Sequence, residues 1–245
     1  MGNSYEFCIS IAQIAIQIKP LSNDMKSYCK QYLIPDNSIV QEVIEITETD
    51  IEIETKYLQA CNAPTYRFNR NILEFDAIHR KVADRLLDHN ILLFHASAIS
   101  INSKAILFSA PSGTGKSTHT QYWKQLYNDN VEIINDDKPL IKCDHNGVFV
   151  YGSPWNGKNR LSSNNFAKLD SICILNRGTD NKITRVSQQE IILELFNQIY
   201  VPTDINKRQK VLSLLDTILK NSKLYVIYCT DSIESARVVS EELLK

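Results

Sequence analysis

The first seventy residues carry the apolar and polar alternation that is typical of strands. Residues 5–18 are rich in β-branched side chains, with apolar residues at every second position near the end, so we expect a strand or hairpin there. Residues 23–33 predict a short helix. Residues 38–55 interleave isoleucine and valine with acids, which predicts further strands. We therefore expect residues 1–70 to form a small β-rich N-terminal lobe.

A different pattern begins near residue 75. Apolar residues recur every three or four positions over residues 75–87, which predicts an amphipathic helix. From residue 91 onward, short apolar runs alternate with helical segments and turn signals, as in α/β proteins. We therefore expect residues 71–245 to form a second domain of the α/β (α+β) class. Its predicted strands are 91–101, 104–109, 131–135, 139–143, 148–151, 171–175 and 224–228, and its predicted helices are 118–126, 188–198, 206–219 and 232–244.

Composition and charge exclude several classes of protein. The chain has 27 Lys and Arg against 28 Asp and Glu, a formal charge of −1, so no overall field favours nucleic acid or an anionic membrane. No apolar run approaches the roughly 20 residues that a membrane-spanning helix needs. The sequence begins without the pattern of a secretory signal, and its six scattered cysteines form no CxxC pair. We expect a cytoplasmic protein that binds neither nucleic acid nor membrane, and an oligomer is possible.

A glycine-rich segment separates the expected strand at 104–109 from the helix that follows it. Its sequence is Ala110-Pro-Ser-Gly-Thr-Gly-Lys-Ser117, and the order strand, loop, helix is the context of a phosphate-binding P-loop. Glycines let backbone N–H groups turn inward around an anion, the lysine reaches the β and γ phosphates, and the serine hydroxyl binds Mg²⁺. Alanine stands where the full pattern has its first glycine, which fits if φ there is negative. We expect a nucleotide and Mg²⁺ to bind here, with nucleotide contacts from Ser112, Gly113, Thr114, Gly115, Lys116, Ser117 and Thr118.

Two adjacent carboxylates and one histidine are candidates for the chemistry. Asp136 and Asp137 follow a predicted buried strand, at the carboxyl edge where α/β sheets place their ligands. One carboxylate could take a proton from an acceptor hydroxyl, while Asp137 with Ser117 could hold Mg²⁺. His95 lies 21 residues before Lys116 and is a further candidate, with a buried core histidine as the alternative.

A second glycine loop runs from Tyr151 to Arg160 with the sequence Tyr-Gly-Ser-Pro-Trp-Asn-Gly-Lys-Asn-Arg. Lys158 and Arg160 can neutralise phosphate charge, and Trp155 offers a surface for stacking or packing. We therefore expect substrate contacts from these three residues and from Asn156. The alternative is a rigid surface turn with a buried tryptophan.

Four segments together resemble a known family. They are Phe94-His95-Ala-Ser-Ala-Ile, Ser-Gly-Thr-Gly-Lys-Ser, Asn-Asp136-Asp137 and Gly-Ser-Pro-Trp-Asn-Gly-Lys, and in this order they resemble the catalytic domain of HPr kinase/phosphorylase over about residues 75–245. The resemblance implies a P-loop core like that of phosphoenolpyruvate carboxykinase, with His95, Asp136 and Asp137 flanking the transferred phosphoryl group, and the P-loop pattern adds Lys116 to these catalytic candidates. It also implies that an aspartate activates an acceptor serine hydroxyl, and we favour Asp136 for that role.

The sequence also departs from the family. Thr118 stands where true HPr kinases have glutamate, and the family's Arg-Gly-x-Gly signature is absent from the sequence. We therefore expect a divergent HPr-kinase-related serine kinase, which transfers the γ-phosphoryl of ATP to a hydroxyl on a peptide, a protein or a small molecule. Two alternatives are a non-catalytic module that senses a bound nucleotide, and a switch NTPase.

Overall fold

The computed structural model describes residues 5–245, which divide into two compact units, one up to Asp88 and one from His89 to Lys245. The first unit holds a four-stranded sheet in the order β3-β1-β2-β4. A tight turn at Ala12 and Gln13, both with positive φ, joins the first two strands as an antiparallel hairpin, which confirms the prediction for residues 5–18. The elements are β1 (Phe7–Ile11), β2 (Ile14–Lys19), α1 (Met25–Tyr28), η1 (Lys30–Tyr32), β3 (Leu33–Ile34), β4 (Glu42–Glu45), α2 (Glu48–Ala60), η2 (Thr65–Phe68) and α3 (Arg70–Leu86).

The prediction that strands continue to residue 55 is wrong, because α2 begins at Glu48. Thr47 and Asp50 form a capping box, in which the Asp50 carboxylate accepts from the backbone N–H and hydroxyl of Thr47. The buried positions that follow, Ile51 and Leu58, have helical spacing, whereas Ile53 is 45% exposed. The alternating isoleucines and acids are therefore the two faces of a helix.

The predicted helix at 75–87 is confirmed as α3, but it groups with the first unit. Glu74 of α3 accepts hydrogen bonds from the backbone N–H groups of Leu21 and Ser22, and Arg80 of α3 pairs with Glu54 of α2. The boundary between units therefore lies after Asp88, whereas the sequence places it after residue 70.

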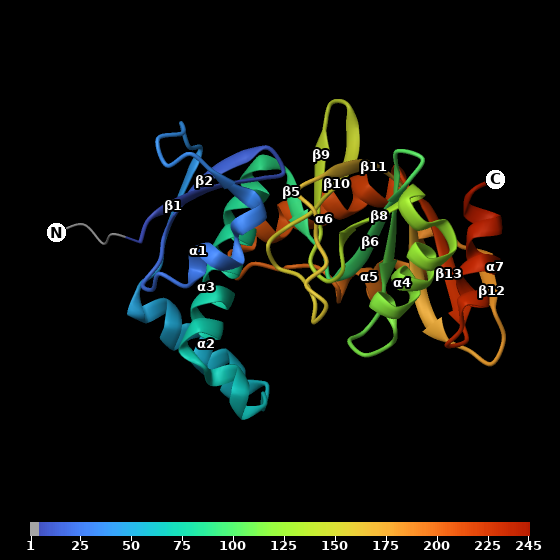
Figure 1. Cartoon of the computed structure of the whole chain (residues 1–245), viewed down its shortest axis with the longest axis horizontal. Helices are drawn as coiled ribbons and strands as arrows, with labels where there is room; N and C mark the ends of the chain where they lie inside the picture. The colour runs from blue at the N-terminus through green and yellow to red at the C-terminus, as the bar shows by residue number, and fades with distance from the viewer. Residues whose placement is uncertain (1–4) are drawn as a thin grey trace. The chain divides into compact units, whose positions relative to one another are not determined.

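The second unit contains a mixed, curled sheet of nine strands with helices packed on it (Figure 1). Seven strands follow the order β5-β9-β10-β11-β7-β6-β8; β13 joins β11, and β12 joins β13. This arrangement confirms the expected mixed α/β class. The strands are β5 (Ile91–Leu93), β6 (Ala96–Ile101), β7 (Lys104–Ser109), β8 (Val131–Asn135), β9 (Leu140–Asp144), β10 (Gly147–Tyr151), β11 (Phe166–Arg177), β12 (Lys182–Arg185) and β13 (Lys223–Cys229). The helices are η3 (Leu87–His89), α4 (Lys116–Tyr127), η4 (Asn128–Asn130), α5 (Gln188–Phe196), α6 (Ile205–Lys220) and α7 (Ile233–Leu243).

Helices α4 and α7 pack together over the central strands. Trp123 of α4 is fully buried between Phe108 and Tyr127, and its indole N–H donates to Nε2 of His119 at 3.1 Å. Burial lowers the pKa of His119 to about 4, so this histidine is a neutral core residue. The packing fixes α4, and with it the loop that precedes α4.

The helices and the cysteines bear on the expectations drawn from composition. None of the helices over residues 5–245 is long and apolar enough to cross a membrane. All six cysteines are free thiols, and five of them are buried, with Cys61 exposed.

Candidate functional site

Strand direction brings the candidate residues to one edge of the sheet. β6 lies between β7 and β8 and runs antiparallel to both. The start of β6 and the ends of β7 and β8 therefore meet at the same edge. His95 immediately precedes β6, the glycine-rich loop follows β7, and Asp136 and Asp137 follow β8.

The glycine-rich loop has the backbone of an anion nest. Gly113 and Gly115 have φ of 80° and 119°, in the left-handed region that favours glycine, and nothing lies within 4 Å of either missing Cβ. Ala110 is not among the residues with positive φ, so alanine is accommodated there. α4 begins at Lys116, and its first N–H groups add the positive end of the helix dipole.

The Lys116 ammonium group is folded back onto its own loop. Nζ donates to the carbonyl of Ala110 at 2.8 Å, and it lies 3.4 Å from the carbonyl of Pro111 and 3.3 Å from Nε2 of His95. The residue is 7% exposed. Burial lowers the pKa of Lys116 below its ordinary value, although the nearby charge of Asp137 opposes the shift.

His95 lies between the lysine and the second aspartate. Its Nδ1 is 2.8 Å from Oε1 of Gln198, so Nδ1 carries a hydrogen that the glutamine oxygen accepts. Nε2 then faces Lys116 and lies 3.2 Å from Oδ1 of Asp137. The ring can therefore accept from the ammonium group when neutral or donate to the carboxylate when protonated.

The two aspartates have opposite environments. Asp137 is partly exposed, and its pKa is lowered: burial acts to raise it, but the hydrogen bond with His95 and the charges of Lys138 and Lys116 outweigh burial. Asp136 is 1% exposed, and burial raises its pKa, with the charge of Asp137 adding to the rise. Asp137 is therefore the ionised carboxylate at the surface, and Asp136 is a buried one with a higher proton affinity.

The buried aspartate is covered by the second glycine loop. The N–H of Gly157 donates to Oδ1 of Asp136 at 2.6 Å. Oδ2 is buried without a hydrogen-bond partner, and a Cβ on Gly157 would lie 3.0 Å from it. A glycine is therefore required where this loop closes on the carboxylate.

Asn135, a residue that sequence reasoning did not assign, ties the acidic turn to this loop. Its Oδ1 accepts from the N–H groups of Asp137 and Lys138, and its Nδ2 donates to the carbonyls of Ser153 and Trp155. An asparagine at the end of a strand, directly before two aspartates, was the signal that could have identified it. The fully buried amide holds both segments in register.

The predicted substrate residues differ in exposure. Trp155 is 3% exposed, so its indole packs inside the fold in this conformation, as the alternative interpretation of the loop predicts. Asn156 donates from Nδ2 to the hydroxyl of Ser162. Lys158 and Arg160 are exposed, and within residues 5–245 neither forms an ion pair.

Ser117 and Thr118, the last two predicted nucleotide contacts, lie on the first turn of α4. The hydroxyl of Ser117 lies 3.4 Å from the carbonyl of Asp136, so it faces the acidic turn. Thr118 is exposed on the first turn of α4. Ser117 thus contacts the backbone of the acidic turn, whereas no hydrogen bond within the described part of the chain links Thr118 to that turn.

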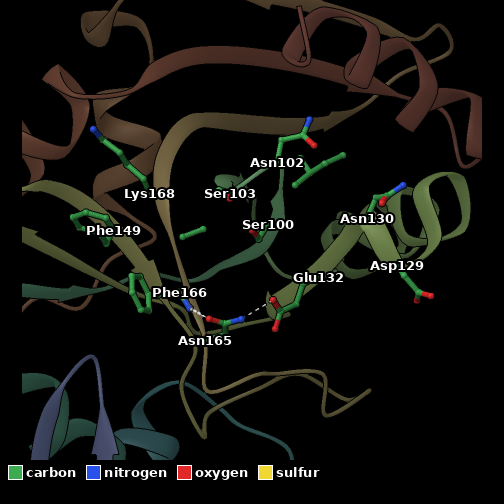
Figure 2. Close-up of a pocket in the computed structure, with 12 residues that line it drawn as sticks. Ser100, Asn102, Ser103, Asp129, Asn130, Glu132, Phe149, Asn165, Phe166 and Lys168 are labelled. Carbon is green, nitrogen blue, oxygen red and sulfur yellow. Dashed lines mark hydrogen bonds between the residues drawn. The ribbon is translucent and has the colours of Figure 1, made fainter.

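A hollow of about 460 Å³ lies at the opposite edge of the sheet, away from the residues above. It opens between the turn after β6 and the starts of β8 and β11 (Figure 2). Asn165 crosses one side, where its amide donates to Glu132 and its carbonyl accepts from the N–H of Phe166 (Figure 2). The hollow and the P-loop edge are therefore separate features.

No family model matches the chain, and no curated protein matches it. Among solved structures, the chain is similar to the Hpr(Ser) kinase/phosphatase from Coxiella burnetii, with 12% sequence identity and a TM-score of 0.36. The likeness covers 62% of this chain and 96% of that one. It concerns the fold, and the roles of individual residues depend on the geometry described above.

Proposed function

We propose that this protein transfers the γ-phosphoryl group of ATP to a hydroxyl acceptor in a reaction that requires Mg²⁺. One observation carries the proposal, namely that His95 lies between Lys116 and Asp137 at the mouth of a P-loop although the three are far apart in sequence. Nε2 of His95 is 3.3 Å from Nζ of Lys116 and 3.2 Å from Oδ1 of Asp137. An anion nest beside an ionised carboxylate and a buried carboxylate is the set of groups that phosphoryl transfer uses.

The P-loop and Lys116 are proposed to bind the phosphates. Backbone N–H groups around Gly113 and Gly115 take the anion, and the ammonium group leaves the carbonyl of Ala110 to reach the β and γ oxygens. The contact with His95 keeps the ammonium group at the mouth of the loop. In this way the chain supplies positioning and positive charge, which are the main contributions to this kind of catalysis.

The donor groups present fit Mg²⁺. The ion prefers oxygen ligands and is usually held by one or two protein groups together with substrate phosphates. Ser117 offers a hydroxyl and Asp137 an ionised carboxylate, and residues 5–245 contain no cluster of three or more acidic, histidine or cysteine side chains that would select another metal. Bound Mg²⁺ would neutralise charge on the β and γ oxygens.

Asp136 is proposed as the general base. Its raised pKa is better suited to proton transfer than the lowered pKa of Asp137, since a base works best with a pKa near the working pH. The acceptor hydroxyl gives its proton to Oδ2 of Asp136 while its oxygen bonds to the γ-phosphorus. The bond from that phosphorus to the β–γ bridging oxygen breaks, and ADP leaves with the electron pair.

The acceptor is proposed to approach along the second glycine loop. Lys158 and Arg160 are exposed cations without ion-pair partners in the described residues, so they are available to a negatively charged group. We propose that the acceptor is a serine-type hydroxyl on a peptide, a protein or a small molecule that carries such a group, and that the setting is the cytoplasm.

A second candidate function is a nucleotide-binding module that performs no transfer. The observation that favours it is the burial of Asp136 beneath Gly157, since an acceptor reaches Oδ2 only if the loop around Gly157 moves away from the carboxylate. Turnover with any acceptor distinguishes this function from the first.

The proposal is tested by incubating the protein with Mg²⁺ and γ-labelled ATP in cell extract separated by a size cut-off. Lys116→Ala is the control, because it removes the phosphate-binding charge. We expect label that depends on Lys116, in the large fraction for a protein acceptor or in the small fraction for a metabolite. Nucleotide binding with no such label in either fraction would favour the binding module.

A further inference from the structure

The last residue of β11 reaches the outer side of the P-loop. β11 runs parallel to β7, and their pairing ends at Ile174 and Ser109, so β11 continues beyond the end of β7. Over this stretch it lies beside the loop that follows β7. Arg177 donates from Nη2 to the carbonyl of Gly113 at 2.7 Å and from Nε to the carbonyl of Thr114 at 3.3 Å.

These carbonyls are the outward-facing side of the anion nest. A loop that turns successive N–H groups inward around an anion must turn carbonyls outward, where they need donors of their own. A guanidinium group presents a rigid fork of donors and can hold two neighbouring carbonyls at once. Arg177 therefore holds the middle of the loop, at Gly113 and Thr114, from a neighbouring strand.

The rest of the loop is held differently. The ammonium group of Lys116 binds the carbonyls of Ala110 and Pro111 at the start of the loop. That tie is lost if Lys116 turns to the phosphates. The fork from Arg177 does not compete with the phosphates, because it lies on the other side of the peptide units.

Arg177 also carries an uncompensated charge. No carboxylate within residues 5–245 lies within ion-pair distance of its guanidinium group, and the residue is exposed. A cation bonded to the carbonyl end of a peptide unit polarises that unit and strengthens its N–H as a donor. The charge and the fork therefore act in the same direction, in favour of an anion inside the loop.

We propose that Arg177 is a positioning residue that holds the P-loop open for nucleotide phosphates without touching them. The inference rests on the proposed nucleotide-binding function and deepens it. It assigns to the end of β11 a part in nucleotide affinity that neither the P-loop sequence nor the acidic turn indicates.

The experiment measures binding of Mg·ATP to the full chain by calorimetry, for the wild type, Arg177→Ala and Arg177→Lys. We expect Arg177→Ala to weaken binding about tenfold or more, since without the two hydrogen bonds the loop is no longer preorganised and has to be ordered when the phosphates bind. Arg177→Lys should recover part of the loss, because an ammonium group keeps the charge but cannot span both carbonyls. Lys182→Ala, which removes an exposed cation on β12, is the matched control and should bind like the wild type.

A second measurement separates positioning from general stability. Thermal unfolding without nucleotide should change little in Arg177→Ala, because the side chain is exposed, whereas hydrogen exchange of the amides at 113–116 in the presence of Mg·ATP should become faster. Equal affinities for the wild type and Arg177→Ala, with Lys116→Ala defective, would overturn the inference and leave the proposed function standing. No Mg·ATP binding by the wild type would overturn both.

Discussion

Replacing Asp136 by asparagine should stabilise the second unit at neutral pH. The side chain is 1% exposed, and one carboxylate oxygen, Oδ2, is buried with no hydrogen-bond partner. A buried ionised group without a partner costs more free energy than a neutral one of the same shape. Asparagine preserves the shape and keeps an oxygen that can accept from the N–H of Gly157.

The size of the effect follows from two opposing contributions. The bond from Gly157 changes from charge-assisted to neutral, which costs about 1 kcal/mol of unfolding free energy. Removal of the charge with its unpaired oxygen raises the unfolding free energy by roughly 2–3 kcal/mol. The net gain is about 1–2 kcal/mol, which corresponds to a rise in Tm of roughly 2–8 °C for a unit of this size.

The pH dependence gives a second test. The pKa of Asp136 is raised above 3.8, so the folded protein binds this proton more tightly than the unfolded chain does. Wild-type stability therefore falls as pH rises from 3.8 through the folded pKa, and the variant lacks this loss. The advantage of Asp136→Asn should grow as pH rises from 3.8 toward 7 and should disappear as pH falls toward 3.8.

The assay is chemical denaturation of both proteins between pH 4 and pH 7. Asp170→Asn is a suitable control, because Asp170 is paired with Lys104 and Lys223 and its pKa is lowered. That variant should lose stability at pH 7. A loss of stability in Asp136→Asn at pH 7, or a gain that does not change with pH, would refute the reasoning.

Three further outcomes are expected. Gly157→Ala should lower stability by about 1–3 kcal/mol in denaturation, because its methyl group would lie 3.0 Å from Oδ2 of Asp136; a neutral result would show that the loop moves freely. Trp123→Ala should lower it by about 3–5 kcal/mol, since the fully buried indole leaves a cavity, and an unchanged Tm would contradict the described packing. Asp137→Asn should be less stable than the wild type at pH 7, with a difference that closes as pH falls below 3.8 through the lowered pKa, because the ionised carboxylate is held by His95; a pH-independent difference would exclude this cause.

Much of the second unit could be predicted from sequence, because its local signals agree with its packing. Short apolar runs such as 104–109 became strands, and the glycine-rich segment lies between a strand and a helix as its residues indicate. Burial on both faces made strands such as β5 and β7 almost entirely apolar, which is why their existence was clear. The full extent of β11, which starts at Phe166, could not be predicted, because apolar and charged residues alternate in its first part.

The first unit was harder to predict, because one pattern fits two structures. Isoleucines separated by acids over residues 48–55 satisfy the period of a strand, and only the capping box at Thr47 and the tertiary pairing with α3 select a helix. The predicted boundary between the units, after residue 70, differs from the observed one for a related reason. A helix shows its own amphipathic face in the sequence, but not which unit covers that face.

The parts of the site that lie within one segment could be predicted from the sequence. The contacts between distant segments could not. The P-loop and the acidic pair have local signatures, whereas Gln198 beside His95 and Arg177 beside Gly113 are contacts between segments far apart in sequence. Nothing in a single sequence indicates such pairs. Likewise, the burial of Asp136 depends on Gly157, which lies 21 residues later in the sequence.

The central claim is that the P-loop binds ATP and that Asp136 activates the acceptor. The most direct measurement compares Mg·ATP binding and labelled phosphoryl transfer in the wild type, Lys116→Ala and Asp136→Asn. The account predicts that Lys116→Ala loses binding, while Asp136→Asn binds like the wild type and transfers no phosphoryl group. Transfer at the wild-type rate by Asp136→Asn would contradict the account and would assign the base to another residue.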